Sequence, residues 1–148
     1  MSNHVRILGT GSRNLTAESY DKIVLLLRYA YQILESSRAI DSVTLVHGGA
    51  YGFDRLAERA AIELGWVLEP HYADWDHCGS DCSPGHQRTN SRGKKYCPLA
   101  GPRRNREMVA SGADVCVSMP LGKSSGTRDC MKQALDAGIR VIELTSSE

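Results

Sequence analysis

The stretch His47-Gly48-Gly49-Ala50-Tyr51-Gly52-Phe53-Asp54 decides the fold. It follows the apolar run 43–46 and precedes a helical pattern that starts at Asp54. Three glycines at a strand-to-helix turn let the backbone adopt positive φ and approach a bound molecule closely. The helix after the turn directs its free N–H groups and its positive dipole end back at it, so an anion can bind there. The alternative is a tight turn whose glycines serve packing alone.

Apolar runs and helical periods alternate along the rest of the chain. Strands that alternate with helices over short connections predict a doubly wound, Rossmann-like α/β fold, with one parallel sheet of about five strands and helices on both faces. We expect residues 1–148 to form a single domain of this kind. The expected strands are 5–8, 43–46, 66–68, 115–119 and 141–144, and the expected helices are about 17–37, 54–64, 102–111 and 127–136.

Three glycine-bearing loops follow predicted strands. They are 9–13, 48–54 and 122–127. Ligands of doubly wound folds bind outside the carboxyl ends of the strands, where these loops lie. Three loops that converge at one sheet edge favour a phosphate-bearing or nucleotide ligand over glycines that serve packing alone.

The ordered motifs in these loops resemble the YspA-like branch of the SLOG superfamily. The motifs are GTGSR (9–13), HGGAYGFD (47–54), ADW (73–75), GPRRNREM (101–108) and GKSSGTRD (122–129). That superfamily groups Rossmann-like domains related to lysine-decarboxylase-like LOG proteins and to DprA. The resemblance covers nearly the whole chain apart from 77–100. It implies binding of a nucleotide or a nucleotide-derived small molecule of the phosphoribosyl or ADP-ribose kind, for sensing or for hydrolysis.

The resemblance also implies which residues line the pocket. Glycine N–H groups and hydroxyls can surround phosphate oxygens, and arginines can bind a phosphate bidentately. Asp54 either accepts hydrogen bonds from ribose hydroxyls or caps its own helix, and the sequence leaves both open. The implied ligand-binding residues are Gly9, Gly11, Ser12, Arg13, Gly48, Gly49, Gly52, Asp54, Arg104, Asn105, Gly126 and Thr127.

One position departs from the pattern of the LOG-type phosphoribohydrolases. Those enzymes carry a G-T-x-x-E element with a catalytic glutamate, whereas Cys130 stands at the glutamate position here. N-glycosidic hydrolysis needs a carboxylate near the sugar, by analogy with glycosidases. Asp54 and Asp129 are the acids near the predicted pocket. The sequence therefore identifies no catalytic residue and leaves turnover open, with these two acids as candidates.

Residues 77–101 form an insertion without an apolar period of either kind. Four candidate metal ligands fall in it with the spacing C-x3-C-x3-H-x10-C, namely Cys78, Cys82, His86 and Cys97. Thiolates and an imidazole at such separations suit tetrahedral zinc, whose binding free energy would order a loop without a core. We expect an irregular insertion stabilised by structural Zn²⁺, with His77 as a spare ligand. The alternative is a flexible loop with incidental cysteines.

The insertion and the start of the next helix are strongly basic. Such a patch can recruit a polyphosphate ligand or a nucleic-acid strand, and a solvated basic loop is the alternative. A DprA-like nucleic-acid-binding module is therefore the second functional hypothesis. A single aromatic residue, Tyr96, lies inside the patch, which favours a small anionic ligand over stacked bases. The basic residues are Arg88, Arg92, Lys94, Lys95, Arg103, Arg104 and Arg106.

Composition is that of an ordinary globular protein, with 41% hydrophobic and 24% charged residues and a formal net charge of +1. No apolar stretch is long enough for a signal or a membrane span, so we expect a cytoplasmic protein without a membrane partner. In a reducing cytosol the five cysteines do not predict a disulfide framework. Cys116 and Cys130 are expected in the core. A homo-oligomer is a further expectation.

Overall fold

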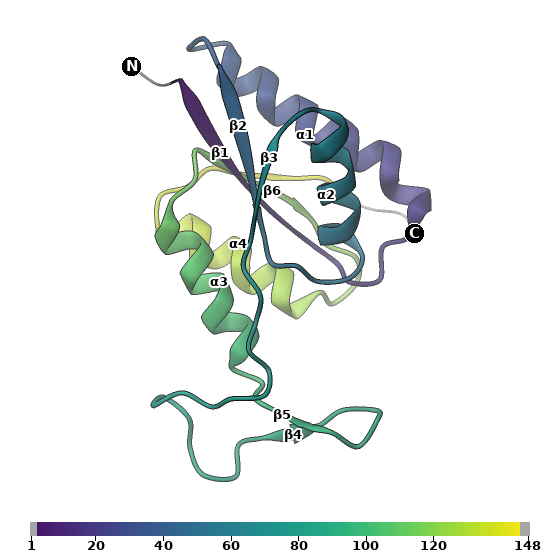
Figure 1. The fold of residues 1–148 in the computed structure, drawn as a ribbon, viewed down its shortest axis with the longest axis vertical. Helices are drawn as coiled ribbons and strands as arrows, with labels where there is room; N and C mark the ends of the chain where they lie inside the picture. Colours follow the sequence, from purple (N-terminus) through teal and green to yellow (C-terminus); the bar gives the residue numbers. More distant parts are fainter. Residues whose placement is uncertain (1–2, 146–148) are drawn as a thin grey trace.

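A parallel sheet organises the computed structural model, which describes residues 3–145 (Figure 1). In this part of the chain five strands form that sheet in the order β3-β2-β1-β6-β7. The strand order reverses between β1 and β6, which makes their carboxyl ends the switch point where such folds bind ligands. The predicted doubly wound class is confirmed. The strands are β1 (His4–Gly11), β2 (Ser42–His47), β3 (Val67–Pro70), β6 (Val115–Met119) and β7 (Val141–Glu143).

Helices cover both faces of the sheet (Figure 1). Helices α1 (Tyr20–Glu35) and α2 (Phe53–Glu63) pack on the face that includes Ile7 and Leu45. Helices α3 (Ala100–Ser111) and α4 (Ser125–Asp136) pack on the face that includes Leu8 and Val46. Adjacent residues of β1 and β2 are thus buried on opposite faces, which explains why these strands are continuous apolar runs rather than alternating ones. No helix within residues 3–145 is long and apolar enough to cross a membrane.

Several predicted boundaries are wrong by a few residues. The first helix is preceded by a short 3-10 helix, η1 (Ala17–Ser19), which Thr16 caps by accepting a hydrogen bond from the N–H of Glu18. Helix α3 begins at Ala100, so Pro102 is its third residue, and α4 begins at Ser125. The N–H groups of a first helical turn have no acceptor within the helix, and proline therefore fits at any of these positions.

The insertion is more regular than predicted. Two short antiparallel strands, β4 (Arg88–Thr89) and β5 (Lys95–Tyr96), form a hairpin that protrudes beyond the start of α3 (Figure 1). Its turn is closed by a hydrogen bond in which the Asn90 N–H donates to the Lys94 carbonyl oxygen over 2.9 Å. Strands of two residues are too short to produce a period in the sequence, which is why this hairpin could not be predicted.

Candidate functional site

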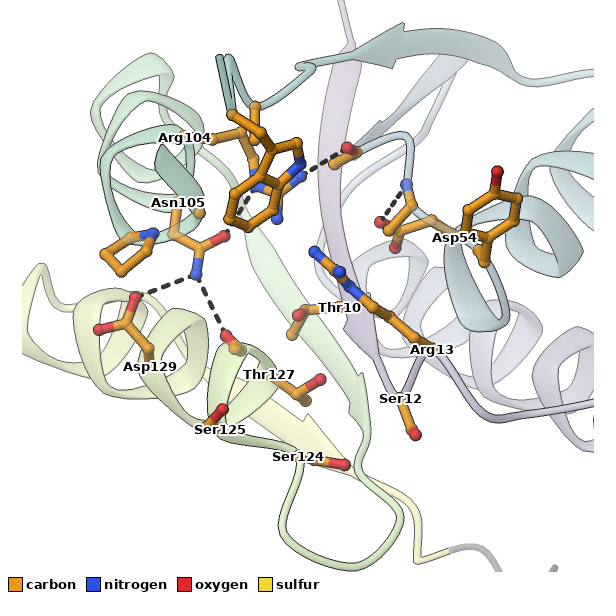
Figure 2. A pocket seen from close by; sticks show the side chains of 18 of the residues that line it. Thr10, Ser12, Arg13, Asp54, Arg104, Asn105, Ser124, Ser125, Thr127 and Asp129 are labelled. Carbon is orange, nitrogen blue, oxygen red and sulfur yellow. Dashed lines mark hydrogen bonds between the residues drawn. The ribbon is translucent and has the colours of Figure 1, made fainter. Parts of the chain in front are cut away.

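A cleft of about 1330 Å³ opens at the carboxyl ends of β1 and β6. All three predicted loops, the start of α3 and the β4–β5 hairpin line it. Gly49 and Gly52 do not line it, although they belong to the glycine turn. Figure 2 shows the side chains at its centre. The predicted residues that line the cleft are Gly9, Gly11, Ser12, Arg13, Gly48, Asp54, Arg104, Asn105, Gly126 and Thr127.

Gly49 and Gly52 shape the turn after β2 rather than the cleft surface. Gly49 has φ +65° and packs against the Tyr72 ring. Gly52 has φ +68°, and a Cβ there would lie 2.5 Å from the carbonyl oxygen of Ser12. An L side chain is strained at such φ values, and this position has no room for one. For these two glycines the packing interpretation is therefore sufficient.

Asp54 is buried at the edge of the cleft, with 7% of its surface exposed. Its Oδ2 accepts a hydrogen bond from the N–H of Ala50 over 3.1 Å, and no side chain caps the start of α2. Asp54 therefore stabilises the glycine turn instead of capping its own helix. Burial raises the pKa of Asp54 to about 6, against the opposing effects of the Ala50 N–H, Arg104 and Arg13.

Arg104 and Asn105 connect the glycine turn to the start of α4. Arg104 donates from Nη1 to the carbonyl oxygen of Gly48 and from Nε to Oδ1 of Asn105. Asn105, which is 3% exposed, donates from Nδ2 to the Gly126 carbonyl oxygen over 3.1 Å and to Oδ2 of Asp129 over 3.0 Å. One side of the Arg104 guanidinium is thus already used within the protein. Burial lowers the pKa of Arg104.

The start of α4 faces the cleft without a neutralising group. Its first turn contains no acidic residue, and no side chain of residues 3–145 caps it. Thr127, in the first turn of α4, is 5% exposed and lines the cleft. Arg13 extends into the cleft from the β1 loop (Figure 2). A partial positive charge, a buried hydroxyl and a guanidinium can together bind an anion.

Cys130, at the position of the missing glutamate, and the candidate acid Asp129 are both engaged within the protein. Cys130 is fully buried in the core with Cys116, as predicted for both cysteines. Asp129 lines the cleft, but its Oδ2 accepts hydrogen bonds from Asn105 and from Nε2 of Gln133 over 2.9 Å. Asp129 therefore positions Asn105 and the α3–α4 contact.

The four predicted metal ligands converge. Their ligand atoms all lie within 4.8 Å of one another, and all five cysteines of the chain are free of disulfide bonds. Sγ of Cys82 lies 3.6 Å from Sγ of Cys97, and Nε2 of His86 lies 3.3 Å from that same Cys97 sulfur. Two thiolates on one tetrahedral zinc would be separated by about 3.7 Å, so the arrangement fits a metal.

The outer contacts of the cluster agree with metal binding. Nδ1 of His86 lies 2.7 Å from the carbonyl oxygen of Ser83. An N–H at Nδ1 donates to that oxygen and leaves Nε2 as the ligand atom, as is usual for metal-bound histidines. His77, the spare ligand of the sequence analysis, lies outside the cluster and pairs with Asp74 at 2.8 Å.

Comparison with known proteins agrees with these loops and this fold. The model of the YspA, cpYpsA-related SLOG family matches residues 5–77. The Gene 61 protein of Mycobacterium phage D29 is 42% identical over 113 residues, which cover 73% of this chain and 76% of that protein. The chain belongs to this SLOG family. The segment that the family model matches ends where the insertion of this SLOG protein begins.

Two solved structures share the fold of the SLOG protein. DprA from Streptococcus pneumoniae superposes with a TM-score of 0.65 at 17% identity, over 97% of this chain and 51% of that one. TM1055 superposes with a TM-score of 0.59 at 20% identity, over 95% of this chain and 72% of that one. This chain thus spans about half the length of the DprA chain. At these identities the likeness concerns the fold.

One wall of the cleft in this SLOG protein was not predicted from the sequence. Trp75 lines it and connects two parts of the site, because the Arg13 guanidinium lies 5.1 Å from its ring and the Tyr96 ring lies 6.0 Å from it, edge-on. Trp75 belongs to the ADW motif, which was a usable signal. The hairpin residues that line the cleft are Arg88, Asn90, Arg92, Lys94 and Tyr96. All but Asn90 belong to the predicted basic patch, but no motif predicted that the hairpin forms a wall of the cleft.

Proposed function

We propose that this SLOG protein binds a nucleotide, or a nucleotide-derived compound of the phosphoribosyl or ADP-ribose type, in the cleft at the carboxyl edge of the sheet. The observation that carries the proposal is the start of α4, which lines the cleft together with Thr127, has no acidic residue in its first turn and has no side-chain cap from Ser124. A helix start with free N–H groups and a positive dipole end binds anions, and a phosphate there would accept a hydrogen bond from the Thr127 hydroxyl.

Other groups of the cleft suit the rest of a nucleotide. Arg13 extends into the cleft (Figure 2) and bears no ion pair to an acid within residues 3–145, so its guanidinium is available to a phosphate. Tyr51 and Trp75 offer ring surfaces to a base. Asp54 lines the cleft, and its Oδ2 accepts the hydrogen bond from the Ala50 N–H. Its other carboxylate oxygen can accept hydrogen bonds from ribose hydroxyls.

Thermal-shift measurements test this proposal. Nucleoside phosphates, NAD and ADP-ribose should raise the melting temperature of the full chain, and Thr127→Val should reduce that rise. Thr89→Val is the matched control, since Thr89 is exposed and does not line the cleft. A folded protein that none of these compounds stabilises would contradict the proposal.

Sensing and N-glycosidic hydrolysis are two uses of the same cleft. In hydrolysis, water would bond to C1′ of the ribose and the base would leave with a proton. We assign Asp54 to that chemistry, because Asp129 is engaged by Asn105 and Gln133. Release of free base from nucleoside monophosphates, lost in Asp54→Asn with binding retained, would establish an enzyme. Binding without release by the wild type assigns the cleft to sensing.

Nucleic-acid binding is the second candidate, and the exposed cations of the hairpin support it. Arg88 and Arg92 contact no acidic side chain within residues 3–145. A salt-dependent gel shift with single-stranded DNA, lost on Arg92→Ala/Lys94→Ala/Lys95→Ala, would favour this function. No shift at low salt would rule it out.

We further propose that the Cys78, Cys82, His86 and Cys97 cluster holds a structural Zn²⁺ and that the insertion and the sheet belong to one domain. Three thiolates and one imidazole complete a tetrahedral shell without leaving a position for substrate. No residue from 76 to 96 is buried, so the hairpin has no apolar core of its own. Metal binding would supply the free energy that orders it.

A further inference from the structure

We propose that the β4–β5 hairpin, held at its base by the cysteine–histidine cluster, selects ligands that carry a second phosphate, and that this selection requires the metal. The inference rests on the proposed nucleotide binding and names the ligand class more closely: a nucleoside di- or triphosphate in preference to a monophosphate.

One face of the hairpin is directed into the cleft. Arg88 pairs with Tyr96 in the ladder, and both residues line the cleft. The next ladder pair, Thr89 with Lys95, does not line it. Successive side chains of a strand point to opposite faces, so this alternation assigns one face to the ligand and one to solvent. The cleft-lining face is the basic and aromatic one.

Of the cleft-lining cations of the hairpin, Lys94 is paired within the protein, whereas Arg88 and Arg92 are not. Lys94 pairs with Asp76 at 3.0 Å, and Arg103 below the hairpin pairs with Asp81 at 2.8 Å. Arg88 and Arg92 bear no such pair within residues 3–145, although both line the cleft. Guanidinium groups bind phosphate in a charge-assisted, bidentate way. The hairpin therefore offers two guanidinium groups to an anion in the cleft.

These guanidinium groups are separate from the anion site at α4. The α4 site combines Thr127 with Arg13, on loops that the strands β6 and β1 position. The hairpin belongs to the insertion, beyond the segment that the family model matches. A monophosphate can occupy one of the two sets, whereas a chain of phosphates can contact both. The hairpin thus adds a preference for a second phosphate to a cleft whose α4 site binds the first one.

The cluster anchors the hairpin on both sides. His86 lies two residues before Arg88, and Cys97 directly follows Tyr96. Cys97 is fully buried, and its N–H donates to the carbonyl oxygen of Trp75 over 2.7 Å. A metal shared by His86 and Cys97 closes the base of the hairpin and keeps its basic face toward the cleft. Without the metal, the hydrogen bond from Cys97 to Trp75 and the edge contact between Tyr96 and Trp75 would have to hold that orientation.

Isothermal titration of the zinc-loaded full chain with AMP, ADP, ATP and the corresponding guanosine nucleotides tests the inference. The wild type should bind a di- or triphosphate about tenfold more tightly than the monophosphate, as one added charge-assisted contact gives. Arg88→Ala/Arg92→Ala should bring that ratio to about one, because the charge-assisted contacts to the second phosphate are lost. Lys95→Ala/Arg106→Ala removes the same charge from exposed residues outside the cleft and should keep the ratio.

The metal is tested in the same titration. Removal of zinc by a chelator, and separately Cys78→Ser with zinc content measured by mass spectrometry, should abolish the preference while monophosphate still binds. A ratio that survives in the arginine double variant, or after complete zinc removal, overturns the inference. Equal wild-type affinity for mono- and diphosphates overturns it while nucleotide binding stands. Failure of every nucleotide to bind overturns nucleotide binding and the inference together.

Discussion

Arg104 on α3 donates a hydrogen bond from Nη1 to the carbonyl oxygen of Gly48, the second residue of the stretch that decides the fold. The same guanidinium donates from Nε to Asn105, which in turn holds the Gly126 carbonyl oxygen at the start of α4. Two loops that follow different strands are therefore connected through two adjacent side chains of a third element. This connection determines the shape of the cleft before any ligand arrives.

Arg104→Ala should lower the free energy of unfolding and weaken nucleotide binding. The variant leaves the Gly48 carbonyl and Asn105 without a donor, which costs about 1–3 kcal/mol for a partly buried charged hydrogen bond. Chemical denaturation and titration with ADP measure the two effects. Arg106→Ala removes an exposed arginine two residues further along α3 and should change neither the free energy of unfolding nor that of binding by more than about 0.5 kcal/mol. Equal effects of both substitutions would contradict the assigned contact.

Gly52→Ala should destabilise the protein, whereas Gly126→Ala should not. At Gly52 the backbone has φ +68° and a Cβ would meet the carbonyl oxygen of Ser12, so strain alone costs about 1–3 kcal/mol. At Gly126 a Cβ meets no atom within 4 Å, and alanine in the first turn of α4 should be neutral or stabilise by up to about 1 kcal/mol. Melting temperatures of the two variants check the contrast. A stable Gly52→Ala protein would contradict the turn geometry.

Asp54 should make the unliganded protein more stable at pH 5 than at pH 7. Its native pKa of about 6 lies above the ordinary aspartate value of 3.8, so the native state retains the proton to higher pH than the unfolded state does. Stability should therefore fall as pH rises from about 4 to 6, by on the order of 3 kcal/mol for a fully buried carboxyl. Asp54→Asn, which keeps an acceptor for the Ala50 N–H, should flatten this part of the profile.

The measurement for Asp54 is urea denaturation at a series of pH values. Glu69 acts in a different window: its fork with Arg6 lowers the pKa of Glu69 to about 2, so its contribution is lost as pH falls below about 4.5. The two carboxylates thus act in opposite directions over separate ranges. An unchanged slope between pH 4 and 6 in Asp54→Asn would contradict the assignment.

Purified protein should contain about one zinc per chain, and Cys82→Ser should lose it. The three remaining ligand atoms cannot complete a tetrahedral shell of the same affinity, so elemental analysis should find less metal in the variant. His77→Ala is the matched control, because His77 pairs with Asp74 outside the cluster and should leave the zinc content unchanged. Metal-free wild-type protein with protected hairpin amides in hydrogen exchange would contradict a structural zinc.

Much of the fold and the position of the cleft could be predicted from local patterns. The apolar runs of β1, β2 and β6 and the glycine loops after them predicted the sheet edge at which the cleft lies. The role of Asp54 could not be predicted, because a carboxylate at a helix start is compatible with a cap, a ribose contact or a turn contact. Its actual partner, Ala50, lies four residues before it, and only the folded turn brings the two together.

The sequence by itself determined the fold class, the three glycine loops and the ligand types of the Cys78, Cys82, His86 and Cys97 cluster. These properties follow from residue chemistry and from short-range periodicity, which the chain displays locally. The tertiary structure alone decided that Arg104 holds Gly48, that Asp129 is engaged by Asn105, and that the β4–β5 hairpin forms a wall of the cleft. Such contacts join residues distant along the chain, and their geometry depends on the packing of whole elements around the switch point between β1 and β6.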